Sequence, residues 1–302
     1  MAFEQAGVNY AAEYSSELRN AYPYLSYFSA LFNSAESQRN RPGMGNTIYI
    51  PSLEAKGARN RVRGTFGGEK KVRNVNIEWQ PFQLEMEREW DTALDPNDIT
   101  QTGGALAVAN ATKTFIEQQK IPEMDAYVAQ KSHALAAAND MLDETAIGAT
   151  TVLSTWDGYM KKLANARVRK EHLLAYATPS FMEALKNSSG ITRFIETGNG
   201  SGTMINRDIE GLDKVRIQEV PEDIMMSAFD FTEGWTPDAG AKQVNLILMD
   251  TTAVFAPILY QTAMTQAPSA LTANNWYYYE AYSYGMGIHK TRTSGLLVNA
   301  NA

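Results

Sequence analysis

Two runs of alternating apolar and polar residues, with a glycine pair between them, constrain the fold of this chain more than any other feature. The alternation extends from Thr47 to Trp90, and a period of two residues is typical of β-strands. Gly67-Gly68 lies between the runs, and glycine readily adopts the positive φ angles that a two-residue hairpin turn requires. The sequence therefore predicts one long antiparallel hairpin.

The predicted hairpin is basic, although the whole chain carries a formal net charge of -7. If the glycine pair sets the register, Arg59 faces Asn76 and Arg61 faces Asn74, so that no two cations lie directly opposite each other. This register puts Arg59, Arg61, Arg63 and Lys70 on one face, and on the other the apolar side chains of Val62, Phe66, Val75, Ile77 and Trp79. The candidate contact residues of the hairpin are Arg59, Arg61, Arg63, Phe66, Lys70, Lys71 and Arg73.

The length of the hairpin indicates that part of it leaves the body of the protein. Arms of about 20 residues that rise about 3.3 Å per residue extend roughly 65 Å, whereas a compact chain of this size has a radius of gyration of about 19 Å. An exposed two-stranded ribbon is marginally stable in water by itself. The basic face could contact nucleic acid, remain solvated or meet a protein; the apolar opposite face favours a protein, which we expect to be another copy of this chain.

The rest of the chain predicts an α+β fold. Pro122, followed by Glu123 in a first turn, predicts a helix that begins at Pro122 and ends near Ala138. Residues 145–250 alternate helical and strand-like segments, and the aromatic-rich segments beyond them are strand-like. Such late strands indicate that the chain returns to an earlier sheet. The predicted helix has one apolar stripe, expected in the core, made of Met124, Tyr127, Val128 and Leu135.

Composition and motifs argue against several classes of function. The 44% hydrophobic content can bury a sizeable core, and we see neither a signal peptide nor an apolar run of the roughly 18 residues that cross a bilayer. An acidic chain lacks the broad basic face of a general nucleic-acid binder. With 0 Cys, disulfides and thiolate metal sites are excluded.

No motif for chemistry is visible either. His133, His172 and His289 fit no metal-binding spacing, and no nucleophile elbow is present. The glycine-rich segment 198–203 lacks the ending of a phosphate-binding loop, and we expect a surface loop there. The aromatic run 276–279 has no interleaved cations, which favours a buried or interface strand over base stacking. We therefore predict no catalytic residue, no cofactor and no metal site.

Four sequence motifs occur in a characteristic order along the chain. They are KIPEMDAYVAQKSHALA at 120–136, LLAYATPSFMEALKNSSGITRF at 173–194, LDKVRIQEVPEDIM at 212–225 and LILMDTTAVFAPILY at 246–260. Together with an N-terminal arm, a long charged hairpin and late strands, the chain resembles the major capsid proteins of tailed phages with the Hong Kong 97-type (Johnson) fold. The resemblance spans nearly the whole chain, and the order of the motifs makes it specific.

The resemblance implies a division of the chain into four parts. These are an N-terminal arm at 1–44, a β-hairpin E-loop at 45–92, a P-domain with a spine helix and a long sheet at 93–145 and 250–290, and an α/β A-domain at 146–249 and 291–302. It also implies a non-enzymatic shell protein. Such subunits form hexamers and pentamers that close into an icosahedral virion capsid around double-stranded DNA, assembled in the host cytoplasm.

The same resemblance sets the expected partners. We expect a separate scaffolding protein, because only 1–44 precede the hairpin, together with a portal, DNA held without sequence-specific binding, and no membrane. The resemblance also allows a decoration protein. Some family members crosslink a lysine to an asparagine; Lys70, Lys71, Asn299 and Asn301 supply the residue types, but no motif assigns them. The alternative is an encapsulin-like nanocompartment, which shares the fold and encloses enzymes.

Overall fold

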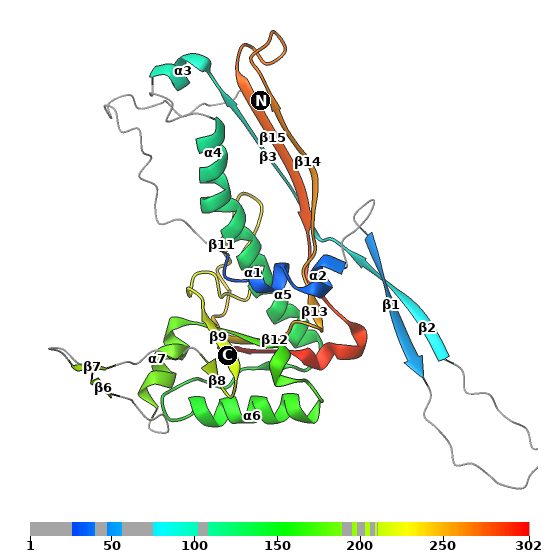
Figure 1. Cartoon of the computed structure of the whole chain (residues 1–302), viewed down its shortest axis with the longest axis vertical. Coiled ribbons are helices and arrows are strands. Elements are labelled where there is room, and N and C mark those ends of the chain that lie inside the picture. Colours follow the sequence, from blue (N-terminus) through cyan, green and yellow to red (C-terminus); the bar gives the residue numbers. More distant parts are fainter. Residues whose placement is uncertain are drawn as a thin grey trace, which may run out of the picture.

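The computed structural model describes residues 26–39, 47–55, 75–101, 108–188, 195–197, 203–205, 209 and 211–301. Within them, a six-stranded sheet with flanking helices forms one end of the molecule, and a three-stranded sheet beside a long helix forms the other (Figure 1). A two-stranded ribbon projects from the side. The expected mixture of helices and sheets is confirmed.

The six-stranded sheet is the centre of the main hydrophobic core. Its order is β4-β17-β12-β5-β9-β8. The central strand β12 is antiparallel to β17 and β5, and β5 is parallel to β9. Every residue of β12 is buried, as expected for a strand covered on both faces. The bounds are β4 Leu142–Asp143, β5 Leu173–Ala177, β8 Gly211–Leu212, β9 Val215–Glu219, β12 Val244–Asp250 and β17 Leu296–Ala300.

Two helices accompany this sheet, within the range 145–250 where helical and strand-like segments are predicted to alternate. α6 spans Val152–Asn165 and buries Trp156, Tyr159 and Leu163. α7 spans Pro179–Asn187, and its N-terminus is capped by Thr178, whose hydroxyl accepts a hydrogen bond from the Phe181 N–H at 3.3 Å. Proline at the first helical position needs no hydrogen-bond partner for its nitrogen, which explains why the helix begins there.

The three-stranded sheet joins the middle of the chain to its end. Its order is β14-β15-β3, all antiparallel, with β3 at Met86–Leu94, β14 at Ile258–Gln266 and β15 at Trp276–Tyr284. Trp276 pairs with Leu94, and Tyr284 pairs with Met86. The prediction that late strands return to an earlier sheet is therefore confirmed.

The long helix beside this sheet corrects one prediction. α5 spans Ile121–Ala138 and ends where expected, but it does not begin at Pro122: α4 (Val108–Phe115) and a π-helical turn (Ile116–Lys120) lead directly into it. Pro122 has no N–H and would clash with a carbonyl four residues earlier in a regular α-helix. The wider π turn, in which the Ile121 N–H bonds to Ile116 O, absorbs this conflict without ending the helix. The predicted stripe is core: Met124, Tyr127 and Val128 are buried, and Leu135 packs against the cluster.

The N-terminal described segment lies against this body. Ser26 and the Tyr27 backbone N–H donate to the two carboxylate oxygens of Asp125 in α5, at 3.0 and 2.7 Å. The Ser37 hydroxyl accepts from the Ala256 N–H at 2.8 Å. The segment contains α1 (Ser29–Phe32) and α2 (Ala35–Arg39).

The remaining elements are short. They are α3 Pro96–Gln101, the strand pairs β6 Ile195–Thr197 with β7 Thr203–Ile205, β10 Phe229–Asp230 with β11 Thr236–Pro237 and β13 Val254–Phe255 with β16 Gly287–Ile288, and the 3₁₀ turns Lys170–His172 and Lys290–Gly295. Across the described ranges, no helix has both the length and the apolar composition needed to cross a membrane.

Candidate assembly surface

The projecting ribbon consists of β1 (Thr47–Ala55) and β2 (Val75–Gln83), which pair antiparallel along their whole length. This confirms the hairpin, but the predicted register is wrong: Asn76 faces Glu54, not Arg59. In the observed register Val75 faces Ala55, and Ile77 faces Leu53. Apolar side chains therefore meet apolar side chains on one face, and this pairing outweighs the turn position suggested by the glycine pair.

The candidate contact residues lie outside the described residues. The described part of the ribbon stops at Ala55 and resumes at Val75. The same holds for Val62 and for Asn74, which the predicted register paired with Arg61. The residues concerned are Arg59, Arg61, Arg63, Phe66, Lys70, Lys71 and Arg73.

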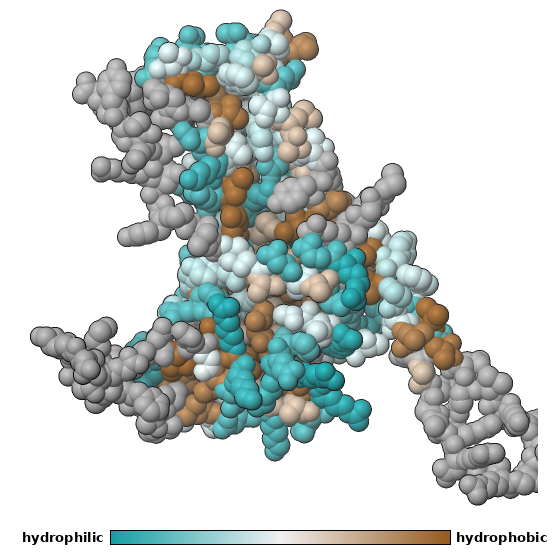
Figure 2. Space-filling view, in the orientation of Figure 1, coloured by the Kyte–Doolittle hydropathy of each residue, from teal (hydrophilic) through white to brown (hydrophobic). Residues whose placement is uncertain are grey.

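One face of the ribbon is apolar and exposed. We call it the apolar face. Its large members are between 56% and 64% exposed, which is unusual for aromatic and β-branched side chains gathered in one place. Figure 2 shows the corresponding brown patch at the far end of the described ribbon. The face comprises Tyr49, Pro51, Leu53, Val75, Ile77 and Trp79.

The other face fixes the root of the ribbon to the body. Ile48 and Ile50 are buried in a small cluster with Leu84 and Phe255, and Phe82 packs edge-on against the Phe255 ring, with 5.0 Å between the ring centroids. Farther out, this face carries the polar residues Ser52, Asn76 and Glu78. The ribbon is thus apolar on both faces at its root and apolar on only one face beyond it.

A glycine permits this close root. A Cβ atom placed on Gly287 would lie 2.6 Å from the Phe255 ring and 2.7 Å from the Phe82 ring. Only a residue without a side chain lets β16 approach the two rings so closely. The root of the ribbon is therefore packed too tightly for the ribbon to pivot freely there.

Ion pairs fasten the three-stranded sheet to the long helix behind it. The Lys120 ammonium, buried in the π turn, pairs with Glu280 of β15 and lies 4.2 Å from the centroid of the Tyr282 ring. The second oxygen of Glu280 accepts from the Tyr278 hydroxyl at 2.7 Å. Because both charged groups are buried, removing either one would leave the other as an uncompensated buried charge.

A second connection lies one turn farther along the helix. Arg88 of β3 holds Glu123 through two nitrogens, at 2.8 and 3.0 Å, and the Tyr284 hydroxyl donates to the same carboxylate at 2.8 Å. Burial opposes the charge on Arg88, but the adjacent Glu123 carboxylate raises the pKa of Arg88 above its ordinary value. Burial, together with Glu123, raises the pKa of Tyr284, which stays a neutral donor. Sheet and helix therefore behave as one rigid support for the ribbon.

No constellation for catalysis or metal binding appears among the described residues. Nowhere in the described ranges do three or more His, Asp or Glu side chains gather in a way that could hold a metal ion. The three histidines lie apart: His133 is on α5, His172 precedes β5, and His289 contacts Glu36 of α2 at 3.4 Å. The residues 198–202 of the glycine-rich segment lie outside the described part.

The two C-terminal asparagines belong to a hydrogen-bond network. Asn299 is fully buried; its amide donates to the backbone oxygens of Asp143 and Thr145, and its oxygen accepts from Asn245. Asn245 also donates to the Asn301 side chain at 2.9 Å. Asn299 is therefore occupied in holding β17 against β4 and has no exposure for a crosslink to a neighbour.

Solved structures share this architecture, although no protein-family profile and no curated protein sequence matches the chain. The asymmetric unit of the bacteriophage PhiM1 mature capsid is 12% identical, with a TM-score of 0.60 over 100% of this chain and 92% of that one. The capsid of Ralstonia phage GP4 is 10% identical, with a TM-score of 0.59 over 100% and 97%. A structure from Gordonia phage Cozz is 12% identical, with a TM-score of 0.63 over 96% and 91%.

These likenesses extend over nearly the whole of each chain, so they concern the complete fold and not one shared motif. The chain therefore has the fold of these phage capsid structures, as the order of its sequence motifs leads one to expect.

Proposed function

We propose that the chain is the major capsid protein of a tailed phage, which assembles through hexamers and pentamers into an icosahedral shell around double-stranded DNA. The observation that carries the proposal is the apolar face: a rigidly rooted ribbon presents Leu53, Ile77 and Trp79 to solvent in the single subunit. An exposed patch of this kind requires a partner surface. The capsid-subunit fold supports the view that the partner is a second copy of the chain.

We assign the parts of the chain accordingly. The ribbon belongs to the E-loop at 45–92, after an arm at 1–44. The long helix and the strands β14 and β15 belong to the P-domain at 93–145 and 250–290. Apart from its edge strand β4, the six-stranded sheet belongs with α6 and α7 to the A-domain at 146–249 and 291–302. In this arrangement the E-loop of one subunit lies across its neighbour in the same capsomer.

Burial of apolar area supplies most of the stability of such a contact. Each Å² removed from water contributes about 25 cal/mol, whereas an exposed ion pair contributes about 0 to 1 kcal/mol and is screened within about 8 Å at physiological salt. The basic residues of the hairpin then select the partner and its register, and Phe66 adds apolar contact area. These basic residues are Arg59, Arg61, Arg63, Lys70, Lys71 and Arg73. Repetition around a ring multiplies the strength of one weak contact.

We propose the same partners that the resemblance implies: a separate scaffolding protein, a portal, and DNA enclosed without sequence-specific binding. Proteins that co-purify with the shells test this point. Portal and DNA agree with a capsid, whereas a cargo enzyme in place of DNA identifies a nanocompartment.

The test of assembly is electron microscopy and sedimentation velocity on the expressed full-length chain and on the variant Arg61→Glu with Arg63→Glu. We expect rings or shells from the unchanged chain, and a folded, unassembled subunit from the variant. A matched control, Lys161→Glu with Lys214→Glu, changes the net charge equally at exposed positions of the A-domain and should assemble. Normal shells from the hairpin variant, or a small enzyme-like oligomer from the unchanged chain, would overturn the proposal.

A further inference from the structure

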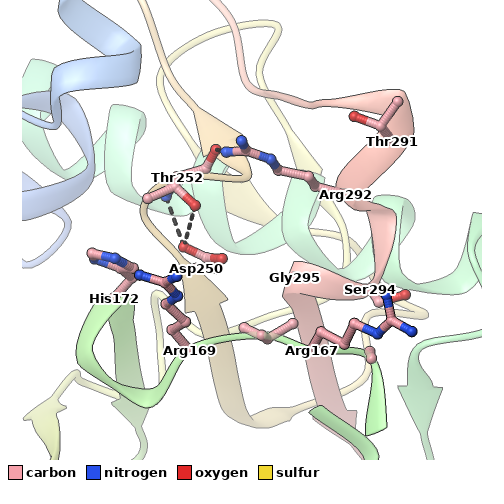
Figure 3. A pocket seen from close by; sticks show the side chains of 11 residues that line it. Arg167, Arg169, His172, Asp250, Thr252, Thr291, Arg292, Ser294 and Gly295 are labelled. Atoms are coloured by element: carbon pink, nitrogen blue, oxygen red, sulfur yellow. Dashed lines mark hydrogen bonds between the residues drawn. The ribbon is translucent and has the colours of Figure 1, made fainter. Parts of the chain in front are cut away.

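A basic cleft lies at one end of the six-stranded sheet, far in sequence from the ribbon. It has a volume of about 430 Å³ and is bounded by the segment 166–172, which joins α6 to β5, and by the 3₁₀ turn Lys290–Gly295. The end of β12 forms its floor. Figure 3 shows Arg167, Arg169 and Arg292 around this opening.

Among the described residues, the three guanidinium groups have no acidic partner. None of them forms an ion pair with a carboxylate of the described ranges. Three like charges on one small opening repel each other, and in an acidic protein counter-charges are plentiful. A cleft that gathers cations without neutralising them is suited to an anion from outside.

The one carboxylate in the lining is already engaged. Asp250 is buried, and its Oδ1 accepts hydrogen bonds from both the backbone N–H and the hydroxyl of Thr252, each at 2.8 Å. The Thr252 carbonyl in turn accepts from Arg292 at 2.7 Å. Asp250 therefore shapes the turn that positions Arg292. Its Oδ1 is used by the two hydrogen bonds of that turn.

The backbone on both sides of the cleft is specialised. Arg167 has a φ of 64° at the end of α6, where its N–H bonds to Ala164 O and the next N–H bonds to Leu163 O. Glycine is the usual residue at such a helix end. On the opposite side, a Cβ on Gly295 would lie 2.6 Å from Ala253 Cβ and 3.2 Å from Asp250 Cβ, so glycine allows the 3₁₀ turn to close onto the floor. Arg167 thus has a backbone conformation that favours glycine, and Gly295 lies where the two sides of the cleft come too close for a side chain.

We propose that this cleft binds phosphate groups, either free or in the backbone of DNA. Guanidinium groups donate paired hydrogen bonds that match phosphate oxygens, and donors from several directions suit a tetrahedral anion better than a planar carboxylate. The hydroxyls of Thr291 and Ser294 lie in the same lining. The volume falls within the range of about 300 to 1,000 Å³ that is common for small-molecule sites.

The test uses the full-length chain at a concentration where it is unassembled. Titration calorimetry with pyrophosphate measures the free anion, and fluorescence anisotropy with a mixed-sequence DNA duplex measures the backbone. We expect Arg167→Gln with Arg169→Gln to weaken pyrophosphate binding at least about tenfold, the loss expected for one charge-assisted hydrogen bond or more. The control Lys161→Gln with Lys214→Gln removes the same charge elsewhere and should change binding less than about twofold.

A second variant separates binding from folding. Arg167→Gly removes the guanidinium but supplies the residue that a positive φ favours, so thermal stability should hold or rise while pyrophosphate affinity falls. A fall in both would instead mark Arg167 as purely structural and contradict the proposal.

The two arms also identify the source of the phosphate. Duplex binding that is lost in the same variant and displaced by pyrophosphate identifies the DNA backbone; pyrophosphate binding without duplex binding identifies a free phosphate ligand. The proposal fails if the unchanged chain binds neither, if the double variant binds both as well as the unchanged chain, or if an oligoglutamate peptide binds more tightly than pyrophosphate.

Discussion

Leu53 and Ile77 face each other across β1 and β2, and both side chains are exposed. Direct cross-strand neighbours of this kind stabilise the pairing of two strands, but their outer surfaces stay in contact with water. The same is true of Trp79 opposite Pro51. The contacts that hold the ribbon together therefore also create the surface that favours association.

The first prediction replaces this pair by an ion pair. In Leu53→Glu with Ile77→Lys, opposite charges face each other, so the strands should stay paired while the apolar face loses its centre. We expect the concentration required for assembly to rise at least about tenfold, equivalent to about 1.4 kcal/mol. Light scattering against protein concentration measures this threshold.

A matched control tests whether the face matters and not the charge. Ser52→Lys places a cation opposite Glu78 on the polar face of the same ribbon. This variant should assemble like the unchanged chain. Equal thresholds for the two variants would show that the apolar face is not buried on assembly.

The second prediction concerns the buried pair Lys120 and Glu280. Glu280→Gln leaves the buried ammonium without a counter-charge and should lower the free energy of unfolding by about 3 kcal/mol. Adding Lys120→Met removes the isolated charge and should recover most of this loss. Chemical denaturation of the unassembled subunit measures both. A double variant no more stable than Glu280→Gln alone would contradict this account.

Much of the fold could be predicted because local patterns and tertiary packing agree. The buried run of β12, the proline start of α7 and the return of β15 to β3 each follow from a pattern that packing reinforces. Pro122 shows where this fails. Its local signal indicates a helix start, but whether a π turn can absorb it depends on the surrounding core, including the buried Lys120 that the turn carries.

The sequence predicted a hairpin with one apolar face as the candidate site, but not the register of its two strands. The alternation that identifies a hairpin also indicates its apolar side, and Val75, Ile77 and Trp79 do share a face. The register could not be read from Gly67-Gly68, because a glycine pair permits a turn without requiring one at that position. The basic cleft was not predicted at all, since Arg167 and Arg292 are far apart in sequence and only the sheet brings them together.

The third prediction tests the root of the ribbon. Gly287→Ala places a Cβ within 2.9 Å of the buried Phe255 ring and the half-buried Phe82 ring, and neither ring can move without disturbing the cluster. We expect a loss of stability of about 1 to 3 kcal/mol, typical of an overpacked core. Gly240→Ala, where nothing lies within 4 Å, is the control and should change stability little. Thermal unfolding compares them, and equal melting temperatures would contradict the tight root.

The fourth prediction concerns pH and the His289 side chain. Burial lowers the pKa of His289; Glu36 of α2 opposes this effect, whereas Arg292 and Arg39 reinforce it. The unfolded chain, with an ordinary histidine pKa of about 6.5, therefore binds a proton at a pH where the folded chain does not. Stability contributed by the neutral ring should be present above that value, fall as the pH drops through it, and level off below the folded pKa.

The melting temperature of the unassembled subunit between about pH 8 and pH 5 checks this sign, because this range spans the ordinary histidine pKa while carboxylates stay ionised. His289→Gln should flatten the decline, since glutamine does not titrate. His133 is the informative comparison: burial also lowers its pKa, but it lies on α5 away from Glu36. His133→Gln should therefore keep the part of the slope that belongs to His289. Stability that rises on acidification would show that the Glu36 contact outweighs burial and raises the pKa of His289. A slope unchanged in His289→Gln would show that the decline does not come from this side chain.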